Sequence, residues 1–141
     1  MTSTASASIA PRRAMAVAVT CAVAGVGAVV AVAVVALVAR AVGAPSTFPQ
    51  LRPGTYIPLA VLGVVAGAVG WEIVIHRARD SRRTLSRLVP AVLILSFVPD
   101  VLLGVSGSPW GGVAALMVMH LAVAAVALPT YNRLLPPPAR A

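Results

Sequence analysis

The sequence predicts an all-α membrane protein, a bundle of four transmembrane helices. Of its 141 residues 60% are hydrophobic and 10% are charged, with a mean hydropathy of +0.97, whereas about a quarter of the residues of a soluble domain are charged. Its apolar runs are long enough to cross a hydrocarbon core of about 30 Å as helices. They are continuous and do not alternate with a period of two, which argues against a transmembrane barrel.

A single transmembrane domain is expected at 14–131, between a disordered tail at 1–13 and a Pro-rich tail at 132–141. Its spans are expected at 14–38, 57–75, 88–105 and 113–131. The first run has no charge over 25 residues. The apolar region of a secretory signal has about 7–15 residues, so we expect this run to be retained as a span.

The arginines predict the orientation of the spans. A cytoplasmic N-terminus places nine of the eleven on the cytoplasmic side and leaves only Arg40 and Arg52 outside. The positive-inside rule therefore favours cytoplasmic termini in a multi-pass protein of the plasma membrane, with Trp110 and Tyr131 at the membrane interfaces.

The polar segment at 76–87 holds the densest group of arginines: Arg77, Arg79, Arg82, Arg83 and Arg87. We expect this group to anchor the topology, or alternatively to bind anionic lipid head groups. Nucleic acid is not expected as a partner, because the arginines flank apolar runs and no basic domain with interleaved aromatic residues is present.

Asp100 is a charged residue inside the third apolar run, where a carboxylate costs about 2.5–3.5 kcal/mol and usually faces a partner or water. Counted along the helices, Asp100 lies about 18 Å above the cytoplasmic end of its span, and His120 lies about 10–15 Å below the outer end of the fourth. These depths coincide, and the short connection makes the two spans antiparallel neighbours. The predicted intramembrane polar centre is therefore Asp100 with His120, and Ser96 lies one helical turn from Asp100.

The second span contains another polar pair and a run of glycines. Glu72 and His76 are one helical turn apart near its cytoplasmic end, which is favourable for a carboxylate followed by a cation. Small residues allow close helix packing in membranes. The expected packing glycines are Gly63, Gly67, Gly70 and, in the third span, Gly104. Both intrachain packing and a homo-oligomer would use this pattern.

Sequence patterns of known catalytic, phosphate-binding and metal sites are not found in the chain. With a single cysteine, Cys21, neither a disulfide framework nor a cysteine-based metal site is expected. A Ser96–His120–Asp100 triad is conceivable, but a transmembrane serine more often bonds to a helix backbone. We therefore expect no enzyme activity, no cofactor and no metal.

Three segments carry a family resemblance: residues 70–72 (Gly-Trp-Glu), 95–100 (Leu-Ser-Phe-Val-Pro-Asp) and 115–120 (Ala-Leu-Met-Val-Met-His). With these three segments in this order, the chain resembles an uncharacterised family of small four-helix membrane proteins from actinobacteria. The resemblance implies a fold and no activity. The residues themselves favour a structural or accessory membrane protein with a buried Asp/His clamp between the third and fourth spans. The alternative is a small proton-linked carrier or membrane sensor that uses the same pair.

Overall fold

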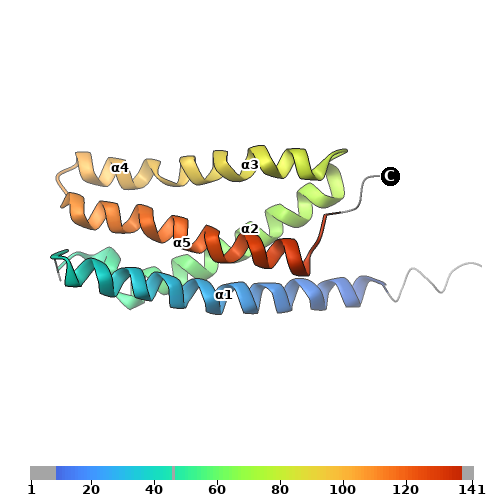
Figure 1. The fold of residues 1–141 in the computed structure, drawn as a ribbon, viewed down its shortest axis with the longest axis horizontal. Coiled ribbons are helices and arrows are strands. Elements are labelled where there is room, and N and C mark those ends of the chain that lie inside the picture. The colour runs from blue at the N-terminus through green and yellow to red at the C-terminus, as the bar shows by residue number, and fades with distance from the viewer. Residues whose placement is uncertain (1–8, 46, 138–141) are drawn as a thin grey trace, which may run out of the picture.

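The computed structural model describes residues 9–45 and 47–137, and this part of the chain is helical without any strand (Figure 1). The elements are α1 (Ile9–Ala41), η2 (Pro49–Leu51), α2 (Pro53–Arg77), α3 (Ser81–Ser96), α4 (Val98–Val105) and α5 (Trp110–Leu134). Four spans within it are long and apolar enough to cross a membrane, with α3 and α4 together forming the third. The predicted four-helix membrane bundle is confirmed.

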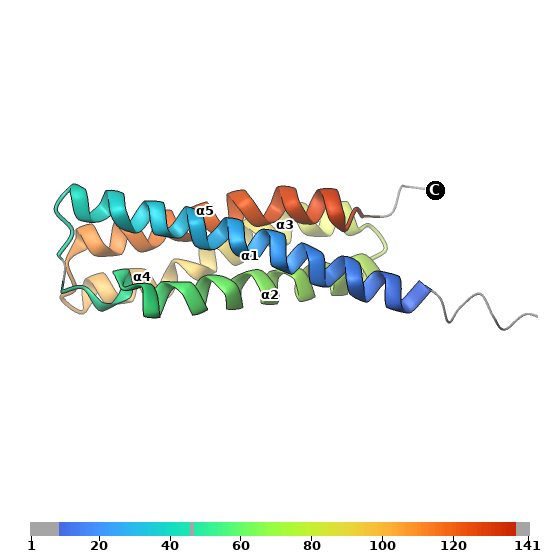
Figure 2. The ribbon, with the colours of Figure 1, turned by 90° about the horizontal axis from the view of Figure 1, so that it is seen from below.

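Helix α1 packs against α5 and α2, while α3 and α4 follow one another along the other side of α5 (Figures 1 and 2). The described chain begins and ends at the same end of the bundle. The buried face of α1 consists mainly of small residues, which allow helix backbones to approach closely. Its buried hydrophobic residues are Ala24, Ala28, Val32, Ala36 and Ala39.

The helices extend beyond the apolar runs that predicted them. Helix α1 begins at Ile9, so 9–13 belongs to a helix and not to the expected disordered tail; 1–8 lies outside the described residues. At the other end α5 continues to Leu134, and Leu135 is only 1% exposed, so the first residues of the expected Pro-rich tail belong to the bundle. Hydropathy marks only the part of a helix that lies in hydrocarbon, and polar flanking residues continue the same backbone hydrogen bonding.

The third span differs most from its prediction. It begins at Ser81 and not at residue 88, because Asp80 caps α3: its Oδ1 accepts a hydrogen bond of 3.0 Å from the backbone N–H of Arg83. Three arginines expected in a loop therefore lie on a helix, and only residues 78–80 connect α2 to α3. The span is also interrupted at Phe97, two residues before Pro99, whose missing N–H breaks the helical hydrogen-bond pattern.

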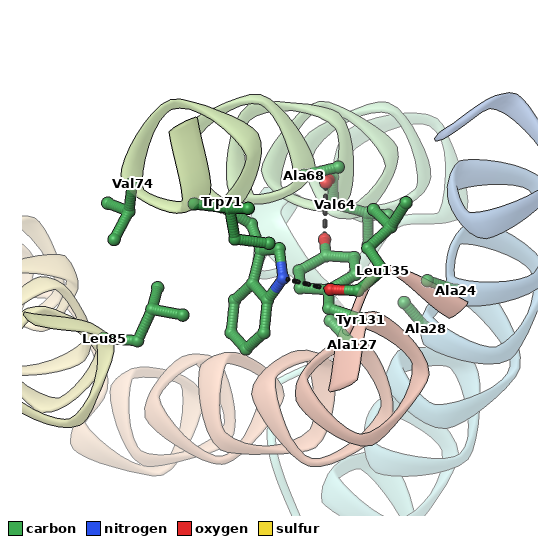
Figure 3. Close-up of a cluster of buried hydrophobic side chains, with 11 residues drawn as sticks. Ala24, Ala28, Val64, Ala68, Trp71, Val74, Leu85, Ala127, Tyr131 and Leu135 are labelled. Carbon is green, nitrogen blue, oxygen red and sulfur yellow. Dashed lines mark hydrogen bonds between the residues drawn. The ribbon is translucent and has the colours of Figure 1, made fainter. Parts of the chain in front are cut away.

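The core at the arginine-rich end is closed by two aromatic side chains that bond to distant backbone carbonyls (Figure 3). The hydroxyl of Tyr131 donates to the Val64 carbonyl at 2.6 Å, and Trp71 Nε1–H donates to the Leu135 carbonyl at 3.0 Å. The two rings lie 5.6 Å apart between centroids. Tyr131 is 3% exposed, so its ring packs inside the bundle and does not face lipid; Trp110, in contrast, is 59% exposed.

The opposite end is closed by the segment between α1 and α2. Phe48 and Leu51 are 5% and 1% exposed and join the buried cluster there. The Phe48 ring lies directly against Gly112, where a Cβ atom would approach the ring to 2.8 Å. Arg40, in the last turn of α1, donates from Nη2 to the Leu51 carbonyl and holds the segment in place.

Candidate functional site: the Asp100–His120 centre

Asp100 owes its position to the interruption of the third span. Helix α4 begins at Val98, so Asp100 lies in its first turn, where the unpaired N–H groups of a helix favour a negative charge. The residue is nevertheless only 5% exposed. A carboxylate is thus buried between α4 and the helix packed against it, α5.

The structure brings Asp100 and His120 together as the sequence predicts. His120 Nδ1 lies 3.2 Å from Asp100 Oδ2, and the two side chains are 38% and 7% exposed. Groups within about 4–6 Å are close enough for strong charge coupling. A polar contact therefore connects α4 to the middle of α5.

The contact is a close approach without a directed hydrogen bond. His120 Nδ1 also lies 2.9 Å from the Leu116 carbonyl one turn earlier in α5. A carbonyl can only accept, so this bond uses the single hydrogen that Nδ1 can carry. Asp100 Oδ2 consequently has no hydrogen-bond donor among the described residues. The imidazole also meets the ring of Phe97 edge to face, with centroids 6.0 Å apart at 85°.

Ser96 is not part of this contact. Its hydroxyl donates to the carbonyl of Leu93, in its own helix, at 2.7 Å. The reason is local: a serine within a helix is in reach of the backbone carbonyls of the preceding turn. The predicted three-residue centre is thus reduced to an Asp–His pair, and the arrangement expected of a serine nucleophile is not formed in the described chain.

Residues 11–137 match the protein family DUF6069, a family of unknown function. The chain belongs to this family. The match extends over all four spans, more than the second to fourth spans on which the sequence resemblance depends. No curated protein and no solved structure matches the chain. Because the function of DUF6069 is unknown, membership in this family supplies no activity for the chain.

A second polar contact in this DUF6069 protein lies near the arginine-rich end. Glu72 Oε2 is 3.2 Å from His76 Nε2, the pair expected from their spacing. Sequence reasoning missed the stronger partner, Arg13 on α1, whose Nε and Nη2 donate to the two carboxylate oxygens at 3.0 Å each. Arg13 lies near the start of α1 and Glu72 near the end of α2. Because the two spans are antiparallel, both residues lie at the same depth, and this was the signal that the sequence offered for the pair.

The four expected packing glycines divide into two pairs. A Cβ at Gly67 would lie 3.0 Å from the Tyr131 hydroxyl oxygen, and one at Gly104 would lie 2.8 Å from the Trp110 ring, so both admit an aromatic side chain. At Gly63 and Gly70 a Cβ would have no neighbour within 4 Å. Half of the predicted glycine pattern thus serves packing within the chain.

Metal-ligating side chains do not gather anywhere in 9–45 and 47–137: groups of three or more His, Cys, Asp or Glu residues placed to hold an ion are not found there. Two open pockets lie away from the Asp100–His120 centre. One, of about 460 Å³, lies between residues 45 and 47–50 on one side and 106–109 on the other, at the end opposite to the described chain ends. The other, of about 590 Å³, lies over the first turns of α3.

Proposed function

We propose that this protein is a structural or accessory protein of the plasma membrane, in which the Asp100–His120 contact clamps α4 to α5. The observation that carries the proposal is the 3.2 Å approach of His120 Nδ1 to a carboxylate that is 5% exposed. Hydrogen bonds between side chains on neighbouring transmembrane helices contribute about 0.6 kcal/mol on average and up to about 1.7. We expect the Asp100–His120 contact, which lacks a directed hydrogen bond, to contribute no more than this. The clamp itself has no turnover in this proposal.

The weak packing of the third span supports a clamp at this place. Within its most apolar segment 11% of the third span is buried by the rest of the protein, against 28% in each of the other spans. Large apolar side chains such as Leu95 and Val105 are 67% and 74% exposed. In lipid such side chains gain little from helix contact, because the acyl chains are equally apolar. A polar contact is then a specific means of fixing the position of α4.

The proposed orientation places the arginine-rich end in the cytoplasm. The described arginines at that end are Arg12, Arg13, Arg77, Arg79, Arg82, Arg83, Arg87 and Arg133; Arg140 lies outside the described residues. Only Arg40 and Arg52 lie at the other end. The positive-inside rule favours this orientation.

One observation favours a second candidate, a small proton-linked carrier or sensor. Asp100 Oδ2 has no donor in the described part of the chain, so the carboxylate can gain a proton there without losing a hydrogen bond. His120 is 38% exposed and its imidazole can also exchange protons. A buried acid beside an accessible imidazole is the minimum that a proton relay requires.

Replacing Asp100 by Asn separates the two candidates, because it keeps the side-chain shape and removes the charge. The clamp predicts a lower unfolding free energy for Asp100→Asn, and no pH-driven flux in liposomes for either protein. The carrier predicts a folded Asp100→Asn variant that loses a flux shown by the wild type. Glu72→Gln, which removes a carboxylate outside the centre, is the matched control and should leave any such flux unchanged.

A further inference from the structure

The segment at 77–87 carries more positive charge than the protein can neutralise. It contains five arginines and a single carboxylate, and the whole chain has only three acidic residues. Glu72 binds Arg13, Asp100 contacts His120, and Asp80 Oδ1 accepts from the backbone of Arg83. Asp80 is therefore the one carboxylate within this segment, and a single carboxylate can neutralise at most one of its five arginines. At least four of these five positive charges thus have no carboxylate counter-charge in the described part of the chain.

The cap at Asp80 places these two arginines on a helical surface. Helix α3 buries Ser81 and Leu85 against the bundle, so Arg82 and Arg83 extend from its exposed side. Together with Asp80 and Ser86 they line the open pocket of about 590 Å³. Two guanidinium groups therefore face one carboxylate, which is held at the helix cap. A planar guanidinium binds phosphate oxygens in pairs, which an ammonium group does not do.

The position of Arg82 along α3 indicates what kind of phosphate group could reach it. Arg82 precedes the apolar run that starts at Leu88 by six residues, or about 9 Å of helix. The polar head-group layer on each side of the hydrocarbon core is about 5–8 Å thick. An arginine side chain at this level reaches lipid phosphates directly.

We propose that Arg82 and Arg83 form a binding site for the phosphate of an anionic phospholipid, in the leaflet at the arginine-rich end. The site depends on the first turns of α3 being helical, so that both guanidinium groups face the same pocket. It is separate from the Asp100–His120 centre and does not depend on the role of that centre.

The test uses the full chain in phosphatidylcholine nanodiscs that contain a small fraction of phosphatidylglycerol. Native mass spectrometry measures which lipid the released protein retains. The wild type should retain phosphatidylglycerol preferentially, and R82Q/R83Q should lose about 30-fold of this preference, since each arginine near an anionic surface contributes roughly a factor of five. Equal retention of the two lipids by the wild type would overturn the proposal.

The matched control is R12Q/R133Q, which removes two exposed positive charges from the same end but outside the pocket. It should keep most of the preference; an equal loss in both variants would show attraction by net charge only and contradict a site. R82K/R83K keeps the charge and should still lose about threefold or more, because the bidentate geometry is gone. Wild-type retention by this variant, or displacement of the lipid by millimolar inorganic phosphate, would also overturn it.

Discussion

Gly67 and Gly63 belong to the same glycine pattern in α2, but alanine at the two positions should have different effects on stability. A Cβ at Gly67 would lie 3.0 Å from Tyr131 Oη, 3.4 Å from Cε2 and 3.6 Å from Cζ, whereas a Cβ at Gly63 would have no neighbour within 4 Å. Tyr131 cannot easily move, because its hydroxyl is bonded to Val64 and its ring is 3% exposed.

The magnitude follows from comparing the two variants. Both gain about 0.8–1.0 kcal/mol of helix propensity on replacement of glycine by alanine, so this gain cancels in the difference. Overpacking of a tight site costs about 1–3 kcal/mol. Gly67→Ala should therefore be less stable than Gly63→Ala by about 1–3 kcal/mol.

The assay is reversible unfolding in mixed detergent and lipid micelles, followed by circular dichroism, together with the oligomeric state from light scattering. Equal unfolding free energies for Gly67→Ala and Gly63→Ala would refute the packing of Tyr131 on α2. A homo-oligomer that is dissociated by Gly63→Leu would show that the uncovered part of the glycine pattern binds a second copy.

Two other contacts give predictions of the same kind. Arg13→Gln and Glu72→Gln should show a coupling free energy of about 1 kcal/mol in a double-mutant cycle, the upper end for partly exposed pairs, because the contact is bidentate. Arg77→Gln combined with Glu72→Gln should be additive, and equal coupling in both cycles would contradict the α1–α2 contact. Gly112→Ala should have an unfolding free energy about 1–3 kcal/mol lower than Gly111→Ala, since the added Cβ would lie 2.8 Å from the buried Phe48 ring at Gly112 and would have no neighbour within 4 Å at Gly111; thermal denaturation of both variants at the same temperature would show that the ring is free to move.

The sequence was sufficient to predict the number of spans and the main contact of the polar centre. Hydropathy marks apolar helices directly, because lipid excludes unpaired backbone groups and leaves few alternatives. The Asp100–His120 contact followed from counting helical rise on two spans joined by a connection of only a few residues. The third and fourth spans are consecutive in sequence and adjacent in space, so the depth of each residue was enough to pair Asp100 with His120.

Contacts between spans distant in sequence were not predictable in this way. The pairing of Arg13 with Glu72 and the burial of Tyr131 depend on how α1, α2 and α5 pack together. The hydropathy of these helices is similar, so it does not indicate which faces are in contact. Tyr131 resembles an interfacial aromatic by position, and only the space beside Gly67 lets its ring enter the core. The start of α3 was accessible, because Asp80 is a strong N-cap residue, but the arginines that follow it favoured a loop.

The central claim, that Asp100 and His120 are in contact inside the membrane, can be measured directly by solid-state NMR in lipid bilayers. Replacing His76 by Asn leaves His120 as the only histidine, since the chain has two. Dipolar recoupling between ¹⁵Nδ1 of His120 and ¹³Cγ of Asp100 should then report a separation below about 4.5 Å, one carbon–oxygen bond of about 1.2 Å beyond the 3.2 Å contact. Absence of coupling between these nuclei in the folded protein would contradict the clamp.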